Sequence, residues 1–251
     1  MVQVPQRAAF SGPTLVRLLA GLSGVVTEAP QSLSDRLSQW LGWTDAIALS
    51  TALNGNPPAV ADDMRVVDSD ENTLCTRART SLTNAIAGAC QSAPAKRGRC
   101  APVPVQLAAF EVAARDAAAH YAECRQRYLS AQQLMEMDIG NLRGRLRTLL
   151  AEKTPAMARL AEVDAVMEQA LGSRERSLLA GVPALLKVHF ERLHEAEHRA
   201  LSEAQTSGEP ATVTPGAWLN LFRKDMQSVL LAELEVRFQP VEGLLAALRT
   251  R

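Results

Sequence analysis

Apolar residues recur at alternating steps of three and four along most of the 251-residue chain. This spacing places apolar side chains on one face of an α-helix, whereas a half-buried strand would alternate at every second residue. In the N-terminal part, the pattern predicts four helices separated by turn-forming Gly, Pro, Asn and Asp residues. The expected helices cover residues 13–22, 32–42, 43–54 and 70–91.

The second part of the chain carries longer patterns of the same kind. Residues 105–153 contain no proline and are rich in Ala, Leu, Gln, Glu and Arg. They predict either one very long helix or two helices broken near residues 139–141 or at Gly144. Three further apolar faces follow, and their members are Met157, Leu160, Val163, Met167 and Leu171, then Leu178, Val182, Leu186, Phe190 and Leu193, and finally Trp218, Leu221, Phe222, Val229, Leu230, Leu234 and Phe238. These faces provide the packing partners that long helices need.

Residues 92–104, SAPAKRGRCAPVP, are the best candidate for a linker because they combine three prolines, a glycine and a basic cluster. No run of alternating polarity indicates a β-sheet. We therefore expect an all-α protein. A small N-terminal helical bundle, residues 1–91, would be followed by a bundle of long amphipathic helices, residues 105–251.

The composition agrees with a helical globular chain. Aromatic residues make up 4%, and Ala and Leu greatly outnumber the β-branched residues, a balance that favours helices over strands. Lys and Arg together number 27, as do Asp and Glu, so no net charge attracts the protein to nucleic acid or anionic membranes. No segment reaches the roughly 18 uninterrupted apolar residues of a membrane span. We therefore expect no direct membrane insertion.

The four cysteines, Cys75, Cys90, Cys100 and Cys124, contain no C-x-x-C pair. An even number of cysteines could form disulfides, but nothing at the N-terminus indicates export. The apolar stretch there is interrupted by Arg17 and lacks a convincing cleavage site. We therefore expect reduced, structural cysteines in a cytoplasmic protein.

The sequence HEAEH fits the H-E-x-x-H pattern with which one class of metalloproteases binds zinc. His194 and His198 would lie one helical turn apart, and Glu195 would take a proton from zinc-bound water. A catalytic zinc also needs a third protein ligand, yet the other histidines, His120 and His189, lie upstream without a second motif. Charged residues surround the pair as well. A solvated charged helix is therefore the preferred interpretation, and a zinc-dependent hydrolase is the alternative.

Arg143, Arg145 and Arg147 lie close together in NLRGRLR, and a second basic group, KRGR, occupies the predicted linker. Either group could contact nucleic-acid phosphates. However, acidic residues are interspersed with the helical arginines, and no aromatic residue for base stacking accompanies the linker. A solvated charged surface is preferred, with a nucleic-acid-binding accessory as the alternative.

Trp40 and Trp43 flank Gly42 at a predicted corner between two helices, in QWLGWTDAIAL. The simpler interpretation is that both anchor the core of the small N-terminal bundle. The alternative is that a partner protein covers them, because Trp is enriched where interfaces concentrate their binding energy. Trp40 and Trp43 are therefore the candidate partner-binding residues.

The segments SGPTLVRLLAGL and QSLSDRLSQWLGWTDAIALSTALNG resemble a proteobacterial family of proteins of unknown function. Genes of that family stand beside genes for a MotA/TolQ-like membrane protein and an OmpA-like peptidoglycan-binding protein. Similar arrangements are assigned to the type III form of the Zorya anti-phage system. The resemblance covers most of the chain and is specific in residues 1–60. It implies a cytoplasmic accessory of a proton-driven membrane motor, and it supplies no catalytic residues.

These observations predict a non-enzymatic cytoplasmic adaptor that needs no cofactor and no small-molecule substrate. Long amphipathic helices suit such a role because their apolar stripes can dock into grooves or pair with the helices of a partner. The expected partner is a protein, and the resemblance implies the cytoplasmic helices of a MotA-like membrane protein. Self-association into a homo-oligomer stays open.

Overall fold

The computed structural model describes residues 14–23, 33–55, 70–91, 106–207, 214 and 216–250. Within these ranges the chain forms eight α-helices and no strand, which confirms the all-α prediction. The helices are α1 (Thr14–Ser23), α2 (Leu33–Trp40), α3 (Trp43–Asn54), α4 (Asp70–Cys90), α5 (Gln106–Ala151), α6 (Pro155–Leu179), α7 (Val182–Ser207) and α8 (Ala217–Arg249).

The long segment without proline forms one continuous helix, α5, of 46 residues. At 1.5 Å per residue it is about 70 Å long. Gly140 and Gly144 do not break it, because buried residues on either side, including Ile139, Leu142 and Leu146, pack into the core. Tertiary packing therefore outweighs the local helix-weakening effect of glycine, which is only about 1 kcal/mol for each residue.

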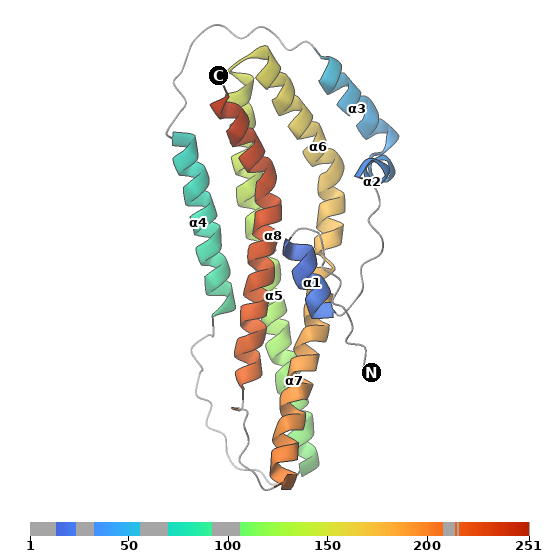
Figure 1. Ribbon diagram of the computed structural model, residues 1–251, viewed down its shortest axis with the longest axis vertical. Coiled ribbons are helices and arrows are strands. Elements are labelled where there is room, and N and C mark those ends of the chain that lie inside the picture. The colour runs from blue at the N-terminus through green and yellow to red at the C-terminus, as the bar shows by residue number, and fades with distance from the viewer. Residues whose placement is uncertain are drawn as a thin grey trace, which may run out of the picture.

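Four roughly parallel columns form the body of the molecule (Figure 1). They are α4, α5, α8 and a column made of α6 followed by α7. The Thr154 hydroxyl begins α6 by accepting a hydrogen bond from the Met157 N–H (3.2 Å), and Pro155 occupies the first turn. A short turn at Ala180 and Gly181 then separates α6 from α7. Gly216, with φ at 82°, precedes α8 in the left-handed conformation that glycine adopts without strain.

The core lies where α5 and α8 pack together, and α4, α6 and α7 contribute to the same buried cluster. Helix α8 is buried along most of its length, including Phe222, Met226, Val229 and Leu230. It continues past Pro240, which lies inside the helix. A helix that is apolar on most sides belongs at the centre of a bundle, and α8 occupies that position (Figure 1).

The N-terminal helices pack on the long helices. Helix α1 contacts α7 and α8, α2 and α3 contact α6, and α4 contacts α5 and α8. The sequence left open whether the N-terminal helices pack on the long helices, and these contacts show that they do. Short helices bury little apolar surface against one another, whereas the long helices offer wide apolar faces. The predicted linker, residues 92–104, lies outside the described residues, and the domain boundaries stay a prediction.

Candidate functional site

The corner between α2 and α3 presents its two tryptophans differently. The N–H of Gly42 donates to Oδ2 of Asp45 (3.0 Å) and so fixes the start of α3. Trp40 is partly buried, and the guanidinium of Arg174 lies 5.7 Å from the centroid of its ring. In contrast, the side chain of Trp43 is 82% exposed. The chain therefore uses one tryptophan in packing and presents the other to solvent.

Trp43 belongs to an exposed apolar stripe along the outer side of α3. Ile47 and Leu53 are 51% and 54% exposed, and the small exposed residues Ala46 and Ser50 lie on the same face of the helix. We call these five residues the α3 stripe. It carries no charge, because the single charged residue of α3 lies in its first turn, outside the stripe. Large apolar residues gathered on one exposed face are a common mark of an interaction surface.

The opposite side of α3 is attached to α6. Ala52 is buried there, and Nε of Arg159 donates to the carbonyl oxygen of Gly55 (3.0 Å) just after α3 ends. This hydrogen bond occupies a carbonyl that the helix itself leaves unpaired. Helix α3 itself lies on the far side of α6 from α5 and α8 (Figure 1).

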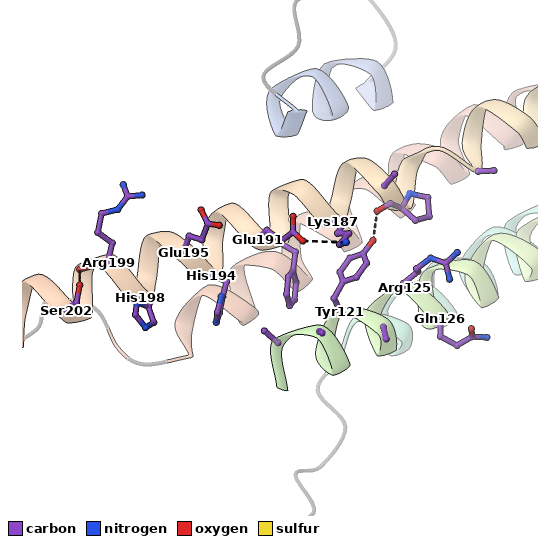
Figure 2. Close-up of a pocket in the computed structure, with 17 residues that line it drawn as sticks. Tyr121, Arg125, Gln126, Lys187, Glu191, His194, Glu195, His198, Arg199 and Ser202 are labelled. Carbon is purple, nitrogen blue, oxygen red and sulfur yellow. Dashed lines mark hydrogen bonds and ion pairs between the residues drawn. The ribbon is translucent and has the colours of Figure 1, made fainter. Parts of the chain in front are cut away.

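The HEAEH residues lie on α7 and line an open groove. His194 is partly buried, with its ring edge-on to Trp218 at 5.0 Å between centroids, while His198 and Glu195 are exposed. Figure 2 shows both histidines projecting from one side of α7 and Glu195 from another. Within the described part of the chain, no three His, Cys, Asp or Glu side chains are placed to hold a metal ion. The zinc alternative thus lacks a third protein ligand among these residues.

The structure separates the three arginines of NLRGRLR. Arg143 and Arg147 face α6, where they form ion pairs with both Asp164 and Glu168 at distances of 2.5 to 3.2 Å. Burial alone would lower the pKa of Arg147. Its hydrogen bonds to Glu168 and Asp164 raise the pKa by more than burial lowers it, so the net shift is upward. Arg145 is exposed elsewhere on α5. Two of the three cations proposed for nucleic acid therefore join α5 to α6, and they do not form the solvated surface that the sequence suggested.

The groove beside HEAEH was not predicted from the sequence. It lies between the first half of α5 and α7 and encloses about 1210 Å³. Its floor contains Tyr121 and Phe190, whose rings meet edge-on at 5.3 Å, and the Tyr121 hydroxyl donates to the Pro183 carbonyl (Figure 2). Small residues such as Ala118 and Ala122 form the α5 wall. The only sequence signal for it was the alanine-rich start of α5, which leaves a shallow wall beside the longer side chains of α7.

A buried carboxylate in α8 is a second feature that the sequence analysis missed. Glu233 is 0% exposed and accepts hydrogen bonds from Tyr128 (2.6 Å), Gln132 (3.0 Å) and Arg237 (2.9 Å). Gln132 also donates to the carbonyl of Leu179, at the end of α6 (3.3 Å). Burial and the neighbouring carboxylate raise the pKa of the Tyr128 hydroxyl far above its ordinary value, so it stays a hydrogen-bond donor. The cluster joins α5, α8 and the break between α6 and α7.

A similar polar connection links α7 with α8 and α1. Nε2 of the buried His189 lies 2.7 Å from Oδ2 of Asp225, and its Nδ1 lies 3.0 Å from the guanidinium of Arg192. Because Arg192 can only donate, Nδ1 accepts, and the proton of a neutral ring then lies on Nε2 and faces Asp225. Arg192 also donates to the Leu22 carbonyl in α1 (2.6 Å). These contacts join α7 to both α8 and α1.

Three buried cysteines, Cys75, Cys90 and Cys124, are free thiols. Burial raises the pKa of Cys90 to about 11, with a further contribution from Cys124. A thiol with a raised pKa is a poor nucleophile near neutral pH. Cys100 lies outside the described residues. The three cysteines within the described residues are therefore reduced, as the sequence predicts.

Comparison with known proteins places the chain in a family. Residues 1–250 match the family described as "Protein of unknown function (DUF3348)", and the chain belongs to that family. No curated protein and no solved structure matches it. Across the described helices, none is both long enough and apolar enough to cross a membrane.

Proposed function

We propose that this DUF3348 protein is a non-enzymatic helical adaptor of the cytoplasm, and that it binds a partner protein through the α3 stripe. The observation that supports the proposal is the 82% exposure of Trp43, on a helix whose opposite side is attached to α6. A large aromatic side chain covered by a partner contributes strongly to binding. The fixed position of α3 reduces the entropy that must be lost on association.

The partner that we propose is the cytoplasmic helical part of a MotA-like membrane protein. In this role the adaptor would be an accessory of a proton-driven membrane motor in defence against phage. The resemblance of residues 1–60 to proteins encoded beside such motors supports this proposal. The character of the α3 stripe supports it as well, because an uncharged stripe at helical spacing suits packing against the apolar face of another helix.

Co-expression with a MotA-like membrane protein of the kind that the resemblance implies tests the proposal. We expect the two proteins to co-purify from detergent extracts, and the variant Trp43→Ala/Ile47→Ala to lose most of the partner. Leu221→Ala is the matched control, since Leu221 is a 48% exposed apolar residue on α8, outside the α3 stripe. The same variants would then be compared in a plaque assay.

Three results would contradict the proposal. One is the absence of co-purification with wild-type protein that is folded by circular dichroism. Another is equal loss of the partner in the Leu221→Ala control, which would mean that the α3 stripe has no special role. Retained binding in Trp43→Ala/Ile47→Ala would likewise move the interface elsewhere on the molecule.

A further inference from the structure

The groove between α5 and α7 has the dimensions of a binding site for a helix. The lining residues of α7 extend from Pro183 to Ser202 along one face, a span of about 29 Å at 1.5 Å per residue. Its volume of about 1210 Å³ exceeds the roughly 300–1,000 Å³ of typical small-molecule pockets. The groove lies at the other end of the molecule from the α3 stripe (Figure 1), so it is a separate surface.

The walls of this groove differ in chemistry. On α5, the exposed residues Ala118 and Ala122 allow close approach of another backbone, and the floor offers the rings of Tyr121 and Phe190. An amphipathic helix buries its apolar face in a groove of this kind. The α5 wall therefore fits the apolar side of an incoming helix, and Arg125 is the one charged side chain among the α5 residues that line the groove.

The α7 wall carries a row of charges in the order base, acid, acid, base. Lys187, Glu191, Glu195 and Arg199 follow one another at four-residue steps, line the groove and are exposed. Within the row, Nζ of Lys187 lies 3.6 Å from Oε1 of Glu191. Residues at four-residue steps form the ridges with which helices interlock. The row therefore lies where the flank of a bound helix would face it.

The order of these charges distinguishes between possible occupants. It reads the same in both directions, so two copies of the row placed against each other in register bring Glu against Glu and Lys against Lys or Arg. Such like-charge contacts disfavour a symmetric pair of this chain. A helix with the complementary order, acid, base, base, acid, places opposite charges at all four positions in either direction.

From this geometry we infer that the α5–α7 groove binds an amphipathic helix of another protein, with an apolar face and the order acid, base, base, acid on its flank. The floor supplies the apolar contact, and the α7 row selects among helices that share that apolar face. The inference does not depend on the α3 stripe, since either surface can be removed while the other is left intact.

Two synthetic helical peptides of equal length and composition test this inference. Both carry Leu at the positions facing the floor; one has Glu, Lys, Lys, Glu on the flank, and the other has Lys, Glu, Glu, Lys. Each is labelled with fluorescein and titrated with the full-length protein in an anisotropy assay. The wild type is expected to bind the first peptide about 10-fold more tightly, as four exposed ion pairs allow.

A charge-reversed protein provides the matched control. The variant Lys187→Glu/Glu191→Lys/Glu195→Lys/Arg199→Glu keeps the net charge and leaves an ion pair at four-residue spacing between positions 187 and 191. It should reverse the preference and bind the second peptide about 10-fold more tightly. The variant Ala118→Leu/Ala122→Leu fills the α5 side of the groove and should weaken both peptides.

Several results would overturn the inference. Equal affinity of the two peptides for both proteins would show that the α7 row does not select a helix. Failure of both peptides to bind at about 1 mM protein would show that the groove is no helix site. Sedimentation that reveals a dimer, abolished by Ala118→Leu/Ala122→Leu, would assign the groove to a second copy of this chain. Loss of the α3 stripe would change none of these results.

Discussion

Helices α8 and α3 use apolar residues in opposite ways. In α8, Phe222 and Leu230 are 0% exposed and stabilise the bundle, whereas in α3 the side chain of Trp43 is left 82% exposed. The sequence pattern of the two helices is similar, because both place apolar residues at three- and four-residue steps. In α8 the apolar stripe is covered by the rest of the bundle, whereas in α3 it is exposed, and this exposure is the observation on which the proposed partner surface rests.

This contrast predicts that changes in α8 lower stability and that changes in the α3 stripe lower binding. The largest effect is expected for Phe222→Ala, because Phe222 is fully buried against Phe190 with the ring centroids 5.0 Å apart. We expect a loss of about 3–5 kcal/mol in the free energy of unfolding, measured by urea titration. The neighbouring Leu221→Ala, at a 48% exposed position, is the control and should lose less than about 1 kcal/mol. Similar losses in both variants would contradict the contrast between buried and exposed residues.

Glu233 tests whether the polar cluster is as important as the apolar core around it. Replacement by Ala leaves the buried Arg237 without its closest carboxylate, and we expect the free energy of unfolding to fall by about 3 kcal/mol. The double variant Glu233→Leu/Arg237→Leu removes both charges and should recover part of that loss. A double variant that is less stable than Glu233→Ala would mean that the remaining partners, Tyr128 and Gln132, depend on the carboxylate itself.

Replacement of Cys90 in α4 should have a smaller effect on the free energy of unfolding, and this effect should depend on pH. Burial raises the pKa of its thiol from 9.0 to about 11, so the unfolded chain releases the proton at lower pH than the folded one. The stability that this thiol contributes is complete below pH 9 and is lost as the pH rises toward 11. Unfolding free energies of wild type and Cys90→Ala, compared between pH 8 and pH 11, should therefore converge or cross as the pH rises. Parallel curves would show that Cys90 does not titrate differently in the two states.

The smallest effect on stability is expected in the α3 stripe. Trp43→Ala should change the free energy of unfolding by less than about 0.5 kcal/mol, since the side chain is mostly in water already. Thermal denaturation followed by circular dichroism measures this change, and the same preparation enters the partner assay. A large destabilisation would mean that Trp43 supports the fold, and the α3 stripe would lose its main evidence as a binding surface.

Local structure followed from the sequence, whereas the packing of the helices followed from it only in part. The helices at residues 70–91 and after Pro155 lie close to their expected positions, because periodicity and capping residues act over a few turns. The charged residues of α7 can be read from the sequence, but their position along a groove cannot. The groove forms only where α7 packs beside α5, which is distant in the chain. Glu233 was unremarked for the same reason: its partners Tyr128 and Gln132 lie more than one hundred positions away.

By itself, the sequence determined that the protein is helical and where most helices begin, because these properties depend on side chains within a few turns of each other. Tertiary structure alone decided which apolar faces are covered. It attached the short N-terminal helices to the long ones, directed Arg143 and Arg147 to acidic partners on α6, and left Trp43 in solvent. Burial and ion pairing depend on contacts between segments far apart in the chain. The spacing of residues along one helix does not determine these contacts.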